Sequence, residues 1–422
     1  MTSEVTAAAA AAGPPLRSIL SLGAIALTLA LAYGSWYAYS VFLVALLQEF
    51  GWSRSTLGGA FSLFAVVQGG ANPLLGMLCD RLRPPLLAAV GSVALGLALW
   101  CDSYISQPWH LYALFGFCTA VAVAFCGWIP AVVQVQRRFQ HRLGLAIGII
   151  SSGVGFGMLV IVPLCQKLIE LYGWRTAFRA QGVICFSIIL PCALYLLQET
   201  PVRVRPVVPT AAALAADPSL HSVTLREAMR TLPFWLMVIA FFCGNICSQT
   251  LHVHQVAFLV DHQIAPMIAA SVVSVVGLSS IVGKTGGGWL SDRVEREVVY
   301  VCGIAVLVAA VGALNLVGLH PTFWGAYVFA VMLGIGYSVT AALTPAMIAD
   351  RFTGHHFGAI LGVGLLGSAS GSALGPWLAG YLHDLTGSYA LPFAIAAGNG
   401  ALAGLAGWTA RVLRLRAARN SG

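Results

Sequence analysis

Charged residues are scarce in this sequence of 422 residues. Asp, Glu, Lys and Arg together account for 9% of the chain, whereas soluble domains carry about 25%. Hydrophobic residues account for 59%, so the chain cannot cover a water-facing surface of its own size. This balance excludes a disordered chain, a coiled coil and a nucleic-acid-binding protein. It predicts a chain whose surface faces mostly lipid.

Cysteine is present, but the paired spacing of a disulfide framework is missing. Most of the ten cysteines, Cys118 and Cys185 among them, lie inside apolar runs, where cysteine packs as a small hydrophobic residue. Cys243 and Cys247 are four residues apart, but no further ligands cluster with them, so we expect no metal site and no cofactor. We also expect no cleavable signal peptide, because the apolar run after Arg17 is too long for one.

Long apolar runs dominate instead. A helix needs about 20 consecutive apolar residues to cross the hydrocarbon core of a bilayer. A polar stretch divides these runs into six and six, which predicts an all-α membrane protein with an N-terminal half (1–198), a linker loop (199–232) and a C-terminal half (233–422). The twelve predicted spans are 19–47, 57–78, 86–103, 109–134, 143–165, 178–198, 233–259, 268–290, 298–319, 324–349, 357–381 and 390–411.

Basic residues are distributed unequally between the two sides of the predicted membrane. With the N-terminus placed inside the cell, seventeen arginines fall on the inner side and four basic residues on the outer side. Lysine and arginine concentrate on the cytoplasmic side of membrane proteins. We therefore expect both termini and the 199–232 loop in the cytoplasm, with the protein in the inner membrane of a bacterium. The net charge of +8 then reflects orientation in a membrane.

The two halves of the sequence repeat each other. The segment Gly76–Arg81 recurs as Gly288–Arg293, 212 residues later. A duplicated six-helix unit is typical of secondary transporters, in which the substrate site lies between the halves near the bilayer midplane. Three further matches lie at offsets of 213 or 214 residues: Arg138-Phe139 with Arg351-Phe352, Gly144 and Gly148 with Gly358 and Gly362, and Gly173 with Gly387.

The repeated segment Gly-x-Leu-x-Asp-Arg resembles the signature of the major facilitator superfamily. The resemblance covers essentially the whole chain, and it implies the fold of that superfamily, with two pseudo-symmetric six-helix halves. Its glycines allow close approach of two helices, and its aspartates can pair with helix ends or arginines. We expect these residues to form a conformational latch that holds one state of the rocking halves: Gly76, Asp80, Arg81, Gly288, Asp292 and Arg293.

A narrower resemblance lies around the fifth span. The segment from Phe139 through Arg142 to Gly148 is similar to a motif of the monocarboxylate transporters and of the related oxalate/formate antiporters. The run Gly375-Pro376 with Asp384–Tyr389 is similar to the same group. Small residues spaced by four also predict that the fifth and eleventh spans each pack closely against a partner helix. These residues are Gly144, Gly148 and Ser152, and Gly367, Gly371 and Gly375.

Lys284 lies inside the eighth span, and no acidic residue lies near the middle of any span. A lone ammonium group in a bilayer costs a few kcal/mol, so it must face the protein interior, water or an anion. In the resembling transporters an arginine occupies the matching position and binds the carboxylate of the substrate. The alternative is a lysine whose ammonium group reaches the nearby cytoplasmic interface.

Two histidines of the seventh span, His252 and His254, lie two residues apart and so on nearly opposite faces of a helix. The resemblance favours His254, thirty residues before Lys284, as a border of the site. An imidazole suits proton coupling because it changes charge between about pH 5 and 8, although a structural histidine is the alternative. Further candidates for substrate contact are Ser280, Tyr33, Tyr37, Asn72 and Tyr337.

These features predict a secondary active transporter that moves a small organic anion by alternating access. A monocarboxylate accompanied by a proton is the expected substrate, because only one cation lies at midspan depth. An exporter of drugs or other small molecules is the alternative within the superfamily, although such pumps usually carry a membrane carboxylate. A membrane sensor is the alternative outside transport. We expect a functional monomer whose partners are lipid, the anion and a proton, with no enzymatic activity.

Overall fold

The computed structural model of the chain describes residues 16–139, 143–198, 224–352 and 357–420, and every regular element within these ranges is a helix. The N-terminal half comprises α2 (Leu16–Phe50), α3 (Arg54–Arg81), α4 (Pro84–Asp102), α5 (Pro108–Leu111), η1 (Tyr112–Thr119), α6 (Ala120–Phe125), α7 (Trp128–Arg138) and α8 (Leu143–Gln198). The described part of the predicted linker loop carries the short helix α10 (Leu225–Ala228), and the C-terminal half comprises α11 (Leu232–Asp261), α12 (Pro266–Ser291), α13 (Arg296–Leu319), α14 (Phe323–Ala349), α15 (Phe357–Thr386) and α16 (Ala390–Asn420).

The predicted spans correspond to these helices. In the described residues, ten helical segments are long and apolar enough to cross a membrane. One of them, α8, holds two spans, because its backbone leaves helical geometry at Gly173 (φ 78°, ψ 161°). The 30-residue helix α15 adds a further span. The ten segments, the second span within α8 and the span of α15 together give the twelve spans that the sequence predicts.

The fourth span differs from the continuous helix that the apolar run 109–134 predicts. It consists of α5, η1, α6 and α7 in succession. The element η1 is a π-helix, and the backbone leaves helical geometry at Gly127 (φ −88°, ψ −156°). Hydropathy does not reveal such interruptions, because the residues on both sides of Gly127 are equally apolar. π-Helical turns are rare and frequently lie near functional sites.

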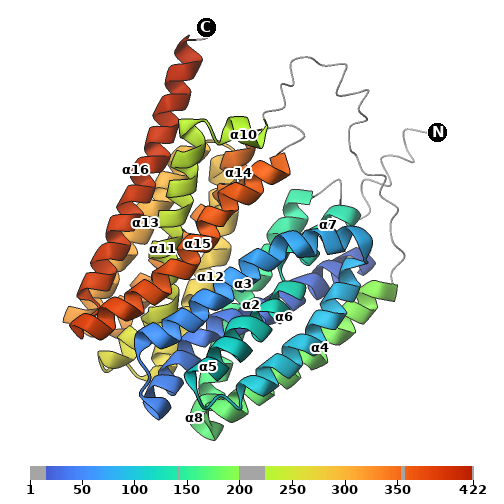
Figure 1. Cartoon of the computed structure of the whole chain (residues 1–422), viewed down its shortest axis with the longest axis vertical. Coiled ribbons are helices and arrows are strands. Elements are labelled where there is room, and N and C mark those ends of the chain that lie inside the picture. Colours follow the sequence, from blue (N-terminus) through green and yellow to red (C-terminus); the bar gives the residue numbers. More distant parts are fainter. Residues whose placement is uncertain (1–15, 140–142, 199–223, 353–356, 421–422) are drawn as a thin grey trace.

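The halves form two adjacent groups of helices, α2 to α8 and α11 to α16 (Figure 1). Their pseudo-symmetry extends to individual hydrogen bonds. The guanidinium group of Arg138 donates to the carbonyl of Leu196 (3.1 Å), and that of Arg351 donates to the carbonyl of Ala410 (2.5 Å). Gly173 also has a counterpart, because the φ of Gly387 is likewise positive (69°). The duplicated architecture is therefore confirmed.

Glycines bring the partner helices within each half close together. A Cβ atom on Gly157 of α8 would lie 2.0 Å from the carbonyl oxygen of Ala30 on α2. The corresponding Gly371 of α15 is equally close to α11, where a Cβ atom would lie 2.2 Å from the carbonyl oxygen of Phe242. Only glycine fits such contacts, because any side chain would displace the neighbouring backbone. The close packing predicted for the eleventh span is confirmed.

On α8 the close contact involves other glycines than those predicted. Nothing lies within 4 Å of a Cβ atom built on Gly148, whereas one on Gly153 would lie 2.3 Å from the carbonyl oxygen of Ala26. Ser152 donates its hydroxyl to the carbonyl of Gly148 in the same helix (3.0 Å). The side-chain surroundings of Gly144 lie outside the described residues. The contact face of α8 is therefore displaced toward Gly153 and Gly157, and the predicted role of Gly148 in packing is wrong.

Contacts between the halves begin at the end of the bundle opposite to the start of α2. There Asp384 of α15 accepts hydrogen bonds from the backbone N–H groups of Arg54 (2.9 Å) and Ser55 (2.7 Å), the first residues of α3. The Arg54 side chain pairs with Asp261 of α11 (2.5 Å) and donates to the hydroxyl of Tyr389 (3.2 Å). We call Arg54, Asp261, Asp384 and Tyr389 the far-end cluster.

Helix crossings continue the contact between the halves toward the middle of the bundle. Gly155 of α8 meets Gly277 of α12, where a Cβ atom would lie 2.5 Å from the opposing carbonyl oxygen. Closer to the end at which α2 begins, Leu74 and Met77 of α3 are 63% and 58% exposed. The structure thus has the halves joined at the far end.

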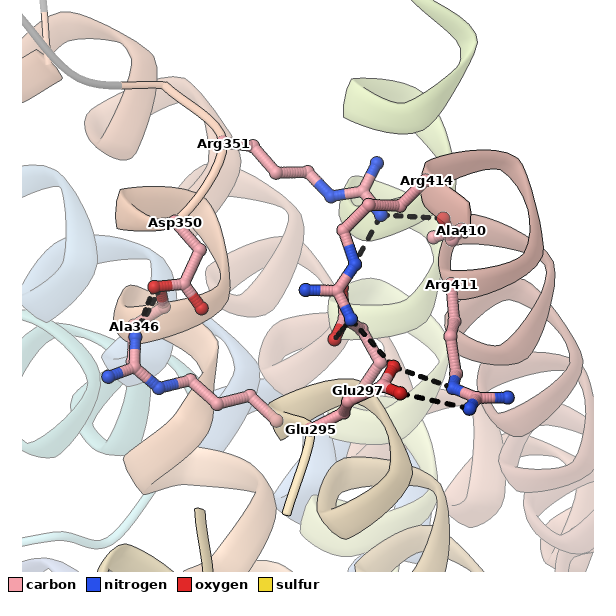
Figure 2. A network of polar contacts seen from close by, with 9 residues as sticks. Glu295, Glu297, Ala346, Asp350, Arg351, Ala410, Arg411 and Arg414 are labelled. Atoms are coloured by element: carbon pink, nitrogen blue, oxygen red, sulfur yellow. Dashed lines mark hydrogen bonds and ion pairs between the residues drawn. The ribbon is translucent and has the colours of Figure 1, made fainter. Parts of the chain in front are cut away.

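A network of charged side chains connects helices of the C-terminal half at the end opposite to the far-end cluster (Figure 2). Arg411 and Arg414 of α16 donate to Glu295, at distances of 2.8 and 2.6 Å. These guanidinium groups, Arg411 first, hold the pKa of the Glu295 carboxyl below its usual value. Glu297, at the start of α13, is buried and pairs with Arg414 (3.1 Å) and Arg351 (3.4 Å). The network fixes α13, α14 and α16 to one another.

Candidate functional site

Aromatic side chains from both halves form a row through the centre of the molecule. On α2, the rings of Tyr33, Trp36 and Tyr37 follow one another, with centroids 5.6 and 6.1 Å apart. Tyr37 is 5.2 Å from the ring of His252 on α11, which in turn lies 4.7 Å from the ring of Tyr337 on α14. The spacing i, i+3, i+4 places the three residues of α2 on one face of the helix.

Lys284 of α12 ends this row. Its ammonium group lies 6.0 Å from the centroid of the Tyr337 ring and 3.4 Å from the carbonyl oxygen of Ser151 on α8. We call Tyr33, Trp36, Tyr37, His252, Tyr337 and Lys284 the central row. Four helices from both halves build it. A site shared by both halves is where alternating access needs its ligand to lie.

The ammonium group of Lys284 is poorly satisfied. It has three N–H donors, and the one hydrogen bond recorded for it, to Ser151, is long. In the part of the chain that the structure describes, no Asp or Glu forms an ion pair with it. The side chain is half-buried. A positive charge in this setting can accept an anion without first breaking an ion pair.

The two histidines of α11 have different surroundings. His252 faces Tyr37 and Tyr337 in the central row. His254 instead lies between α11 and α15, with Nε2 2.9 Å from the carbonyl oxygen of Pro376 and Nδ1 3.1 Å from the hydroxyl of Tyr389. The sequence analysis favours His254 as a border of the site; in the structure His252, and not His254, lies in the central row. Both ring nitrogens of His254 have partners within the protein.

Three buried polar atoms, two in the central row and one beside it, have no hydrogen-bond partner among the described residues. They are Nε1 of Trp36, Nε2 of His252 and Oε1 of Gln249. Gln249 lies close to the Tyr37 hydroxyl. An unsatisfied buried polar group costs about 1–3 kcal/mol, so such groups call for an explanation. Their occurrence along the row that ends at Lys284 is consistent with a place that receives a polar ligand.

The remaining candidates for substrate contact lie outside this row. Ser280 is fully buried where α12 crosses α8, and its hydroxyl donates to the carbonyl of Gly277 (2.7 Å). Asn72 of α3 is partly exposed. Sequence reasoning did not find Gln68, which is buried on α3 close to Tyr33. A glutamine in an apolar span is the signal that points to it.

The predicted latch residues are open to their surroundings in this conformation. Nothing lies within 4 Å of a Cβ atom built on Gly76 or Gly288. Arg293, which follows α12, stacks on Trp289 of that helix, 3.7 Å from the ring centroid. Arg81 and Asp292 are exposed, and Phe139 ends α7. The side chain of Asp80, and Arg142 of the family motif, lie outside the described residues, so both roles remain predictions.

Comparison with known proteins places this arrangement in a family. The family model described as the Major Facilitator Superfamily matches residues 25–285 and 253–421, which together cover most of the chain. The fold agrees with solved members. A bacterial homologue of the human lysosomal transporter Spinster, in an inward-facing and unoccupied conformation, aligns with a TM-score of 0.72 over 94% of this chain and 98% of that chain, at 16% identity. The nucleoside transporter NupG aligns with a TM-score of 0.71 over 93% and 99%, at 14% identity.

Curated relatives extend over nearly the same length. Monocarboxylate transporter 13 of Bos taurus is 28% identical over 385 residues, which cover 88% of this chain and 85% of that protein. Monocarboxylate transporter 12-B of Danio rerio is 27% identical over 84% and 78%, and the uncharacterized MFS-type transporter YcxA of Bacillus subtilis is 19% identical over 85% and 86%. The duplicated six-helix unit agrees with a family match that extends over both repeats. The chain belongs to the major facilitator superfamily and is an integral membrane transporter, not an enzyme.

Proposed function

We propose that the protein transports a small organic monocarboxylate together with a proton. The observation that carries this proposal is the unpaired ammonium group of Lys284 at the end of the central row. A carboxylate is an anion that fits one cation beside a tyrosine ring. The relatives named monocarboxylate transporters support this substrate class.

A single cation favours a monocarboxylate over a dicarboxylate. A second carboxylate in this buried centre would have no cation to pair with. It would cost several kcal/mol or have to bind protonated. The row of aromatic rings offers an apolar surface to the remainder of the substrate and only a few polar atoms.

We infer that the substrate moves by alternating access in the inner membrane of a bacterium, with both termini in the cytoplasm. The far-end cluster then faces the periplasm. This orientation rests on the seventeen arginines assigned to one side and the four basic residues assigned to the other. Its test is a reporter fused after the C-terminus or inserted at Thr210. Activity of a periplasm-specific reporter at either place would overturn the orientation.

Uptake into proteoliposomes tests the substrate class. Radiolabelled acetate, lactate, pyruvate and benzoate are compared with oxalate and succinate, with and without an inward proton gradient. We expect accumulation of at least one monocarboxylate, an increase when the outside is acidic, and little uptake of either dicarboxylate. Uptake of dicarboxylates alone, or of organic cations expelled against their gradient, would contradict the proposal.

A further inference from the structure

We propose that His252 is the group that binds the transported proton, and that Lys284 links this protonation to binding of the anion. The inference rests on the proposed function, because it assumes an anion at Lys284. It names the residue that takes up the proton and the physical reason why proton uptake is coupled to anion binding. Three features carry it: a ring nitrogen without a partner and the lack of a counter-anion, both among the described residues, and an aromatic neighbour shared with Lys284.

The tautomer of His252 follows from its one hydrogen bond. Nδ1 lies 2.7 Å from the carbonyl oxygen of Ser248. A carbonyl oxygen can only accept, so Nδ1 carries the hydrogen and Nε2 of the neutral ring carries a lone pair. Nε2 is buried and without a partner among the described residues. It is therefore the atom to which a proton would add, forming an N–H bond on a ring that stays fixed by Ser248.

The surroundings of His252 do not favour a positive ring on their own. The aromatic neighbours are Tyr37 from α2 and Tyr337 from α14, and Gln249 of α11 lies beside Tyr37. Among the described residues, no Asp, Glu, Lys or Arg forms a hydrogen bond or an ion pair with the ring. Such a charge, buried without a counter-ion, is costly.

The other helices that pack against α11 direct their polar groups elsewhere along it. Tyr300 of α13 donates to the carbonyl of Ala240, and Ser372 of α15 donates to Asn245. Tyr389, which precedes α16, contacts His254. The charged group that shares a ring neighbour with His252 is thus Lys284, across Tyr337.

Binding of an anion at Lys284 makes a positive charge on His252 more favourable. In the empty site the positive charge of Lys284 opposes a second positive charge on His252. A carboxylate bound at Lys284 cancels that repulsion and supplies the missing negative charge, so the proton and the anion each favour the binding of the other. This coupling is reciprocal by thermodynamic necessity. One proton is taken up from water with each anion, and the proton leaves Nε2 for water when the anion leaves.

His254 provides a matched control on the same helix. Its Nε2–H donates to the carbonyl of Pro376, and its Nδ1 accepts from the hydroxyl of Tyr389. The neutral ring is therefore fully satisfied by the protein. The partners of the His254 ring, Pro376 and Tyr389, do not connect it to Lys284. A variant at His254 removes a buried histidine of the same span without touching the central row.

The experiment compares His252→Gln with His254→Gln in proteoliposomes, using the monocarboxylate of the uptake panel that the unmodified protein transports fastest. A pH-sensitive dye inside the vesicles reports proton entry, and exchange of labelled for unlabelled anion reports movement without net proton transport. We expect His252→Gln to lose proton entry by about tenfold or more while exchange continues. His254→Gln should keep its ratio of protons to anions.

A proton-to-anion ratio in His252→Gln equal to that of the unmodified protein would overturn the assignment. So would loss of exchange together with loss of anion binding, because His252 would then be a ligand of the anion. Independently of any variant, the purified protein in weakly buffered detergent should take up about one proton per anion bound, and anion binding without proton uptake would also overturn it. Failure of the proposed function is a different result, namely no monocarboxylate uptake by the unmodified protein.

Discussion

At the scale of single residues, the proposed anion site depends on the positive charge of Lys284. Removing its charge should abolish anion transport, because Lys284→Ala leaves the central row without a cation. Lys284→Gln should be nearly as inactive, since an amide donates a hydrogen bond but brings no charge. Lys284→Arg should keep partial activity, because guanidinium also pairs with carboxylate. Initial uptake rates in proteoliposomes measure all three.

Lys167→Ala is the matched control for the lysine variants. Lys167 is the other lysine of the sequence and lies exposed on α8. Its removal should change uptake by less than about twofold, since an exposed group away from special features contributes little. Full organic-anion transport by a correctly inserted Lys284→Ala protein would refute both the residue assignment and the substrate class.

Residues of the site differ in how far the sequence reveals them. Lys284 could be predicted, because a charge in an apolar run stands out in any reading of the chain. The choice between His252 and His254 could not, because both lie in the same apolar run. Their surroundings are decided by partners distant in sequence, Tyr337 for His252 and Pro376 for His254. The tyrosines of the first span were predicted only as candidates.

At the scale of helices, glycine contacts predict where added volume is tolerated. A Cβ atom on Gly157 would lie 2.0 Å from the carbonyl oxygen of Ala30, so Gly157→Ala must push α8 away from α2. Overpacking of this kind costs about 1–3 kcal/mol. Gly148→Ala, on the same helix, meets nothing within 4 Å. We expect a lower melting temperature in detergent for Gly157→Ala alone, and equal melting temperatures for both variants would contradict this packing.

The charged network of the C-terminal half predicts a second contrast. Glu297 is 4% exposed and faces two arginines (Figure 2). Glu297→Gln removes the ion pair of the largely buried Arg351 and leaves Arg414 with Glu295 alone; loss of one partner costs about 3–5 kcal/mol in comparable buried pairs. Asp350 pairs with Arg296 at a more exposed position, so Asp350→Asn should cost about 0–1 kcal/mol. Thermal unfolding of both proteins checks the order, and a reversed order would refute it.

The number and positions of the helices could be predicted, because each span must be long and apolar to cross lipid. Interruptions inside a span could not. The π-helix η1 and the break at Gly127 depend on how α3 and α4 pack against the fourth span. Apolar side chains on both sides of a break give the same hydropathy as an unbroken helix.

At the scale of the whole molecule, the duplication was predictable and the conformation was not. Matched residues at offsets of 212 to 214 reveal two copies of one unit. Which end of the bundle is closed depends on contacts between the copies, such as Asp384 with the start of α3. No repeat within the sequence encodes these contacts, because the residues that form them are not copies of one another.

Spin labels at Tyr172 of the N-terminal half and Leu319 of the C-terminal half report the separation of the far ends. Both residues are exposed, 64% and 72%, and both lie where their helices reach that end. The labels are introduced as cysteines in a background in which the exposed native cysteines are replaced by serine. These are Cys101, Cys118 and Cys302.

Arg54→Gln should shift this molecule toward a state that is open at the far end. The change removes the ion pair with Asp261 and weakens the contact with Tyr389. Hydrogen bonds to charged groups contribute about 1.5–3 kcal/mol, enough to change a two-state ratio by about tenfold or more. Double electron–electron resonance should then show a larger population of long distances. Arg175→Gln removes an ion pair with Glu49 within the N-terminal half and should leave the distances unchanged. Identical distance distributions in both variants and the unmodified protein would mean that the far-end cluster does not hold the halves together.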